Sequence, residues 1–189
     1  LTQTELEKYR GFVRRRGQRE PAAYILGEKE FYSLAFEVSA AVLVPRPETE
    51  HLVDEALRWL NARMSADGRQ PPSVLEIGAG SGCISVSLAK NLPSIRITAT
   101  DISAAALAVA RRNADRHKVA GRIDFREGDL FSPLGGACFD LIVSNPPYIA
   151  ENDAAVWPEA RKYEPACALF AGNDGLAIYR RLARDIQGF

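Results

Sequence analysis

The chain has 189 residues, of which 47% are hydrophobic and 25% charged, and its 24 basic and 24 acidic side chains cancel. This is the composition of a globular domain with a sizeable core, and zero net charge provides no general electrostatic attraction to nucleic acid, although such a partner is not excluded. Three cysteines without a CxxC pair and two histidines exclude a zinc constellation, so no metal site is expected. No apolar stretch is long enough to span a membrane and no signal peptide is apparent, which predicts a cytoplasmic protein with reduced thiols.

The first third of the chain predicts two helices separated by extended segments. Residues 4–16 form a short, highly charged helical pattern, and residues 30–44 alternate aromatic or β-branched with polar side chains, which is typical of a short hairpin or of two extended segments. Pro45 and Pro47 end that segment, and the apolar positions of residues 48–64 follow a helical period. Residues 65–72 are expected to form a loop.

From residue 73 onward, apolar strands alternate with helices. Strands are expected over residues 73–78, 95–101, 122–129 and 139–145, and helices over residues 82–92, 104–118 and 175–186. Ser103 is placed to cap the second of these helices. Continuous apolar strands are typical of strands buried on both faces. The pattern therefore predicts an α/β fold, a Rossmann-like parallel sheet with helices on both faces.

In such a sheet, ligands bind at the carboxyl ends of the strands. The first strand ends at Glu76 and a glycine-rich turn, residues 78–82, whose backbone can approach a ligand closely at a helix N-terminus. Its spacing differs from the GxGxxG fingerprint, and alone it is equally typical of a tight turn. Asp101 ends the second strand 23 residues after Gly78, where a carboxylate can accept hydrogen bonds from ribose hydroxyls. The alternative is an ordinary polar residue before Ser103.

The last two strands end in further candidates. Asp129 follows the third strand and can accept from the exocyclic amine of a base while Leu130 or Phe131 packs on the face of that base, although a simple turn is the alternative. The fourth strand ends in Asn145-Pro146-Pro147-Tyr148, which offers a side-chain oxygen, a free carbonyl and an aromatic face. These groups together suit a planar –NH2 group. A rigid turn explains Asn-Pro alone but not all four residues beside the glycine-rich turn.

These motifs together resemble the class I methyltransferases that use S-adenosylmethionine, in which the NPPY type modifies adenine N6 or a glutamine amide. Residues 42–50, VLVPRPETE, resemble the signature of the HemK/PrmC family of N5-glutamine methyltransferases, and residues 22–38 and 164–182 are similar to that family as well. The resemblance implies methylation of the glutamine in the Gly-Gly-Gln motif of a peptide chain release factor, with S-adenosylhomocysteine as the second product. A ribosomal-protein glutamine is the alternative substrate.

The resemblance also implies roles for individual residues. The Asn145 side-chain oxygen and the Pro146 carbonyl would accept the two hydrogens of the substrate amide, and Tyr148 would pack on the amide plane. The cofactor-binding residues are expected to be Glu76, Gly78, Ala79, Gly80, Ser81, Gly82, Asp101, Ile102, Asp129, Leu130 and Asn145. The substrate-binding residues are expected to be Arg46, Pro47, Glu48, Asn145, Pro146, Pro147 and Tyr148. A helix-start turn with an ion pair is an equally good interpretation of residues 46–48.

Three regions are expected along the chain. Residues 1–20 would be the remnant of an N-terminal helical domain, residues 21–72 the hairpin and entrance helix, and residues 73–189 the cofactor-binding core. The family fold has seven strands, so the resemblance implies a chain truncated after the fourth strand and its helix. The fourth strand would then have an unpaired edge through which the chain could self-associate.

Two alternatives come from other classes of protein. An adenine-N6 nucleic-acid methyltransferase would share NPPY, but the neutral charge, the absence of a target-reading domain and the PRPETE segment argue against it and against direct nucleic-acid binding. A truncated, non-enzymatic cofactor-binding fragment is the other. A dinucleotide-dependent dehydrogenase would have the wrong glycine spacing and would leave NPPY unexplained.

Overall fold

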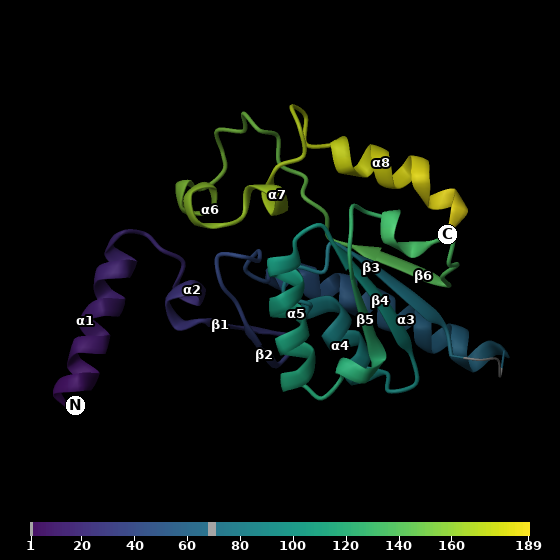
Figure 1. Cartoon of the computed structure of the whole chain (residues 1–189), viewed down its shortest axis with the longest axis horizontal. Coiled ribbons are helices and arrows are strands. Elements are labelled where there is room, and N and C mark those ends of the chain that lie inside the picture. Colours follow the sequence, from purple (N-terminus) through teal and green to yellow (C-terminus); the bar gives the residue numbers. More distant parts are fainter. Residues whose placement is uncertain (1, 68–70) are drawn as a thin grey trace.

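A four-stranded parallel sheet lies at the centre of the computed structural model, which describes residues 2–67 and 71–189 (Figure 1). The strands are β3 (Ser73–Ile77), β4 (Arg96–Asp101), β5 (Ile123–Glu127) and β6 (Leu141–Ser144), in the spatial order β5-β4-β3-β6. The chain therefore starts inside the sheet at β3, moves outward through β4 and β5, and returns to the other side of β3 with β6. This reversal places a topological switch point at the carboxyl end of β3, where open α/β sheets bind ligands. The predicted α/β fold is confirmed.

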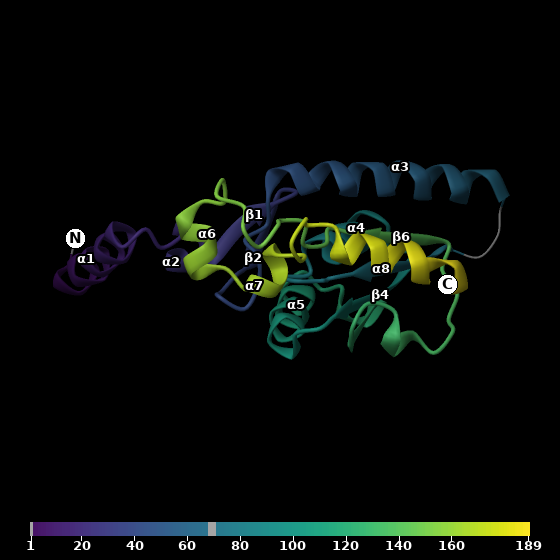
Figure 2. The same ribbon diagram turned by 90° about the horizontal axis from the view of Figure 1, so that it is seen from above.

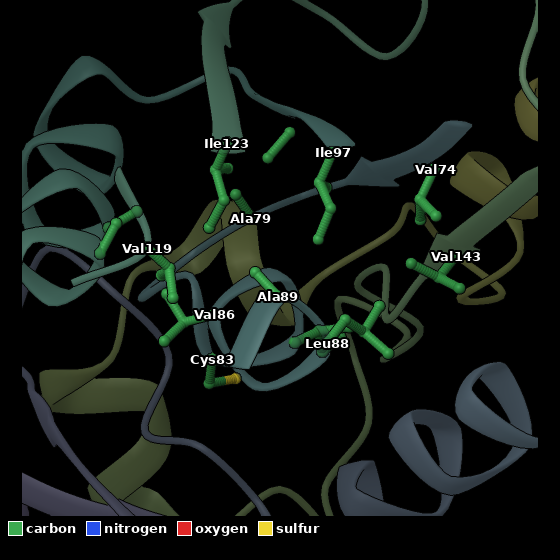
Figure 3. Close-up of a cluster of buried hydrophobic side chains, with 14 of the residues drawn as sticks. Val74, Ala79, Cys83, Val86, Leu88, Ala89, Ile97, Val119, Ile123 and Val143 are labelled. Atoms are coloured by element: carbon green, nitrogen blue, oxygen red, sulfur yellow. The ribbon is translucent and has the colours of Figure 1, made fainter. Parts of the chain in front are cut away.

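One face of the sheet is covered by three helices, α3 (Glu50–Asp67), α4 (Cys83–Asn91) and α5 (Ala104–Arg116). Helix α3 includes residues 65–67 of the loop expected over residues 65–72, and residues 68–70 of that loop lie outside the described residues. Figure 3 shows how side chains from all four strands, among them Val74, Ile97 and Val143, meet Val86 and Leu88 of α4. The predicted Ser103 cap is confirmed, because its side chain accepts a hydrogen bond from Ala106 N at 3.2 Å.

The opposite face of the sheet is covered more thinly. Leu75 and Ile77 alternate with Val74 along β3 and pack on this face against Phe131 and Leu134, the latter in a short 3-10 helix, η3 (Ser132–Leu134). Helix α8 (Ala177–Asp185) contributes a partly buried Leu182, and Figures 1 and 2 show this helix running alongside β6. Helices thus pack on both faces, but unequally.

The hairpin consists of β1 (Glu28–Phe31) and β2 (Leu34–Glu37), and it is shorter than predicted. Residues 38–44 form no strand. Their buried valines pack against α5 and Tyr24 in a separate cluster, so apolar periodicity here reflected burial and not strand pairing. The hairpin is joined to the start of α3, because Tyr32 N donates to Glu50 Oε1 at 2.9 Å.

The N-terminal helix α1 (Gln3–Gly17) extends away from the sheet in both views (Figures 1 and 2). Thr2 and Glu5 form a capping box at its start, and none of its residues is buried. The helix predicted over residues 4–16 is confirmed. A short helix α2 (Ala22–Leu26) leads from it to the hairpin.

The connection after β6 contains two short helices that the sequence pattern did not predict, α6 (Pro158–Tyr163) and α7 (Ala166–Leu169). Three further 3-10 helices are η1 (Pro47–Thr49), η2 (Ala120–Arg122) and η4 (Ile186–Gly188).

Within the described residues β6 pairs only with β3, so its other edge is unpaired. In the same part of the chain, no helix has both the length and the apolar character needed to cross a membrane.

Candidate active site

A cavity of about 310 Å³ lies at the carboxyl ends of the four parallel strands. Its lining contains most of the predicted site residues, namely Arg46, Glu76, Gly78, Ala79, Gly80, Ser81, Asp101, Ile102, Asp129, Leu130, Asn145, Pro146 and Pro147. Four predicted residues are not part of this lining, namely Pro47, Glu48, Gly82 and Tyr148. We call this space the cofactor cavity, after the ligand that the sequence resemblance implies.

The glycine-rich turn is folded onto the end of β4. The N–H groups of Gly78 and Ala79 both donate to Thr100 O, at 2.8 and 2.9 Å. A Cβ added at Gly78 would meet no atom within 4 Å, so the turn faces open space there. At Gly82, with φ of 77°, an added Cβ would lie 3.1 Å from Ala110 Cβ. Gly82 therefore allows the turn to pack closely on α5 and does not contact the cavity.

Asp101 is held in place by the backbone around it. Its Oδ2 accepts from Gly80 N at 2.8 Å, and its Oδ1 accepts from Ser103 N at 2.9 Å. Each carboxylate oxygen can accept a further hydrogen bond. The side chain is therefore preoriented in the cavity wall, with acceptor capacity left for the hydroxyls of a ligand.

Glu76 is a buried carboxyl group with one unpartnered oxygen. Its Oε2 accepts from Ser85 N at 3.0 Å and from the Ser85 hydroxyl. Its Oε1 is buried and has no hydrogen-bond partner among the described residues. Burial raises the pKa of Glu76 to about 8, against the opposing effect of the Ser85 hydrogen bonds. Glu76 is one of the residues that line the cofactor cavity, and a buried acceptor without a partner beside a cavity suits a cationic group of a ligand.

Helix α8 contributes to the wall near Asp129. Arg181 Nη2 donates to Asp129 Oδ2 at 2.6 Å, and both Arg181 and Ile178 line the cofactor cavity. The carboxylate of Asp129 is about half exposed, and Oδ1 is not used in this hydrogen bond. The predicted contact of Asp129 with a base amine stays a prediction.

Asn145 lies where two cavities meet. A second cavity of about 270 Å³, the side cavity, shares with the first the residues Leu43, Arg46, Thr49, Asn145, Pro146 and Ala168. Tyr148 and Glu48 line the side cavity alone. The Asn145 Nδ2 donates to Thr49 Oγ1 at 3.0 Å, so the amide oxygen is the group left for a ligand. Tyr148 is 60% exposed and forms an aromatic wall of this side cavity.

The segment that follows β6 is held by the segment around α7. Ile149 N donates to Leu169 O at 3.0 Å, and Ala171 N donates to Ile149 O at 2.9 Å. Gly175 lies so close to Tyr148 that a Cβ added there would be 2.3 Å from Tyr148 O. Sequence reasoning assigned no role to this contact. Its signal was the similarity of residues 164–182 to the family.

The turn that contains residues 45–48 is anchored by an ion pair. Arg46 Nη2 lies 2.6 Å from Oε1 of Glu164, whose side chain is only 3% exposed. Residues 46–48 were expected either to bind the substrate or to form a helix-start turn with an ion pair. Arg46 does form an ion pair, and it also lines both cavities. Pro47 begins η1 and is exposed, while Glu48 is exposed at the side cavity.

Sequence reasoning also missed a buried polar residue on α5. Asn113 is 0% exposed, and its side chain accepts from Glu37 N at 2.7 Å and donates to Ser81 O at 2.9 Å. It therefore links the hairpin to the glycine-rich turn. Its only sequence signal was an amide within an otherwise apolar helix face.

Two family descriptions match the chain. "Methyltransferase small domain" matches residues 49–160, and "PrmC N-terminal domain" matches residues 1–27. The first match includes every part of the cofactor cavity contributed by β3, β4, β5 and the end of β6.

Curated relatives are similar over nearly the whole chain. A release factor glutamine methyltransferase of Geobacter sulfurreducens is 50% identical over 183 residues, which cover 95% of this chain and 60% of the relative. One from Chlorobaculum tepidum is 48% identical over 188 residues, which cover 97% of this chain and 63% of the relative. The chain spans about 60% of the length of these relatives.

Among solved structures, the hMettl16 catalytic domain in complex with MAT2A 3′UTR hairpin 1 superimposes with a TM-score of 0.61. The match covers 88% of this chain and 61% of that chain, at 18% sequence identity. At this identity the likeness establishes the fold alone.

Proposed function

We propose that the chain, which belongs to the methyltransferase small-domain family, is a HemK/PrmC-type enzyme that uses S-adenosylmethionine to methylate the side-chain amide nitrogen of a glutamine. The substrate would be the Gly-Gly-Gln motif of a peptide chain release factor, because several relatives at 44–50% identity carry the name release factor glutamine methyltransferase. The observation that carries the proposal is the position of Asn145 and Pro146 at the junction of the two cavities.

The residues of the cofactor cavity fit S-adenosylmethionine. The unpartnered Glu76 Oε1 would accept from the ammonium group of its methionine part, and Asp101 would hold the ribose hydroxyls. Asp129, Leu130 and Ile102 would surround the base. The bound cofactor supplies a methyl group activated by a sulfonium, so the protein's task is mainly to position the nitrogen that receives it.

Asn145 and Pro146 perform that positioning. A glutamine amide nitrogen is a weak nucleophile because its lone pair is delocalised into the carbonyl group. If the Asn145 oxygen and the Pro146 carbonyl accept the two amide hydrogens, the nitrogen gains electron density and its lone pair is directed toward the cofactor cavity. Tyr148 would pack on the amide plane from the side cavity.

The reaction does not require a strong general base. The amide nitrogen can release its proton after the methyl group has been transferred. Cys83 lines the cofactor cavity, but burial raises the pKa of its thiol to about 12, so it stays protonated and does not act as a nucleophile. Pre-positioned acceptors thus account for the chemistry that this site can perform.

The proposal extends to partners and location. The enzyme would act in the cytoplasm on a protein substrate, without binding nucleic acid directly. Its three regions would be the N-terminal helical remnant (residues 1–20), the hairpin and entrance helix (residues 21–72) and the cofactor-binding core (residues 73–189). The unpaired edge of β6 would allow self-association, since an unprotected edge strand is a template for pairing.

The test offers labelled S-adenosylmethionine to the chain with a release factor, with the same factor carrying a replaced Gly-Gly-Gln glutamine, and with duplex DNA. The Geobacter sulfurreducens relative serves as the parallel control. Label on the release factor that disappears with the glutamine replacement is expected. Label on DNA, or label transferred by the relative but not by this chain, would contradict the proposal.

A further inference from the structure

Thr49 contacts Asn145 in the part of the lining that the two cavities share. It is 8% exposed and lies at the end of η1, where its own N–H donates to Arg46 O at 3.0 Å. Its Oγ1 accepts from Asn145 Nδ2 at 3.0 Å, although the two residues are 96 positions apart in the chain. Both residues line both cavities.

The orientation of the Asn145 amide matters because its two ends have opposite hydrogen-bonding character. The oxygen can accept a hydrogen bond from the NH2 group of a substrate amide. The NH2 group of Asn145 cannot, because it would place one hydrogen-bond donor against another. A rotation of 180° about the last side-chain bond exchanges the two ends. A partner that holds the NH2 group therefore decides which end faces the substrate.

The turn that carries Thr49 is fixed independently of this contact. Arg46, three residues earlier, pairs with the buried Glu164, and Glu50, the next residue, accepts from Tyr32 N at 2.9 Å. The hydroxyl of Thr49 is thus presented from a turn anchored on both sides. Loss of the hydroxyl should therefore change the Asn145 amide and leave the turn in place.

We propose that Thr49 is a positioning residue for methyl transfer. It holds the NH2 group of Asn145, so that the amide oxygen faces the junction of the cavities. This inference rests on the proposed function for its kinetic effect, but the hydrogen bond itself can be measured without activity. Replacing the hydroxyl by a methyl group would leave the NH2 group facing an apolar side chain, where it is no longer fixed.

Two substitutions isolate the hydroxyl. T49V keeps the shape of the side chain and removes the hydrogen bond, whereas T49S keeps the hydroxyl. We expect T49V to lower kcat by a factor on the order of 100, the cost of a misplaced reacting group, with little change in KM for the release factor or in cofactor affinity. T49S should retain near wild-type kcat. T98V, the same exchange on β4 away from Asn145, is the matched control.

A double substitution tests whether Thr49 acts through Asn145. If it does, T49V should lower kcat no further in a chain that already carries N145A. Equal losses in both backgrounds would overturn the proposal, as would wild-type kcat in T49V alone.

An NMR measurement distinguishes this inference from the proposed function. The side-chain NH2 signals of Asn145 are assigned in the 15N-labelled chain by comparison with N145A. Their chemical shifts should change in T49V and stay close to the wild-type values in T49S. Unchanged signals in T49V would overturn the positioning role even if glutamine methylation is found. Shifted signals in a chain that labels no release factor would support the contact and reject the proposed substrate.

Discussion

Arg46 and Glu164 join two segments that are 118 residues apart, with Nη2 of the arginine 2.6 Å from Oε1 of the buried carboxylate. The other oxygen of Glu164 accepts from Val44 N at 3.3 Å. The turn of the VLVPRPETE segment is thereby fixed to the segment that also holds the backbone after Asn145. The two family-like motifs at opposite ends of the chain therefore form one wall of the site.

Replacing Glu164 by glutamine should destabilise the chain. The substitution keeps the size and one acceptor but removes the charge that Arg46 contacts. Charge-assisted hydrogen bonds contribute about 1.5–3 kcal/mol, and because Arg46 is 40% exposed we expect the lower end of that range. The free energy of unfolding in urea measures it. E55Q, which disrupts the exposed pair of Glu55 with Arg58 on α3, is the control, and an equal effect of both substitutions would contradict the prediction.

Glu76 should make the stability of the chain depend on pH. Its pKa rises from 4.5 in the unfolded chain to about 8 in the folded chain, chiefly through burial. Between these values the folded chain holds a proton that the unfolded chain has released, so the free energy of unfolding falls as pH rises from 4.5 to 8. The slope contributed by one such group is about 1.4 kcal/mol per pH unit. Urea unfolding at several pH values should show a flatter dependence in E76Q.

The same group should link cofactor binding to proton release. If the ionised Glu76 accepts from the cofactor's ammonium group, cofactor affinity should increase as pH rises toward 8. Calorimetry in buffers of different ionisation enthalpy would detect the released proton. An identical proton release in E76Q would show that another group titrates.

Asn145→Ala should affect turnover more than cofactor binding. Alanine removes the side-chain acceptor for the substrate amide and leaves the glycine-rich turn and Asp101 unchanged. We expect kcat to fall by a factor on the order of 100 or more, because orientation of the nitrogen is lost. Steady-state kinetics and calorimetry with S-adenosylhomocysteine measure the two effects. Wild-type turnover in the variant would eliminate the proposed mechanism.

Asp101→Ala should show the opposite pattern. The carboxylate is held by Gly80 N and Ser103 N, and Asp101 is one of the residues that line the cofactor cavity. Its loss should weaken S-adenosylhomocysteine binding by at least tenfold, about 1.4 kcal/mol, with a smaller effect on kcat at saturating cofactor. Asp124→Ala, on the exposed side of β5, is the control. Unchanged affinity in the Asp101 variant would remove this residue from the predicted cofactor site.

Much of the core could be predicted from the sequence because strands buried on both faces leave continuous apolar runs. The carboxyl ends of parallel strands meet at one edge, so Glu76, Asp101 and Asn145 were expected together, and all three line one cavity. The hairpin was predicted too long because Val38 and Val42 are buried against α5 without strand pairing, and periodicity cannot distinguish these two causes.

The supporting contacts of the site could not be predicted in this way. Thr49 with Asn145 and Arg46 with Glu164 join residues about 100 positions apart, and no local pattern encodes such a pair. Gly82 was assigned to the cofactor because glycine-rich turns commonly approach ligands, whereas its packing on α5 depends on a neighbouring helix. The boundaries of the three regions stay a prediction.

Gly175→Ala should distort the active site from outside it. At φ of 75° a Cβ is strained, and it would lie 2.3 Å from Tyr148 O, a backbone atom that cannot move aside without displacing the segment after Asn145. We expect destabilisation by roughly 1–3 kcal/mol, which is typical of overpacking, together with a marked loss of turnover. Gly27→Ala, at φ of 77° and with nothing within 4 Å of an added Cβ, is the matched control. Unfolding in urea and steady-state kinetics on both variants would measure the effects. Wild-type stability and turnover in the Gly175 variant would mean that the segment around α7 does not hold Tyr148 in position.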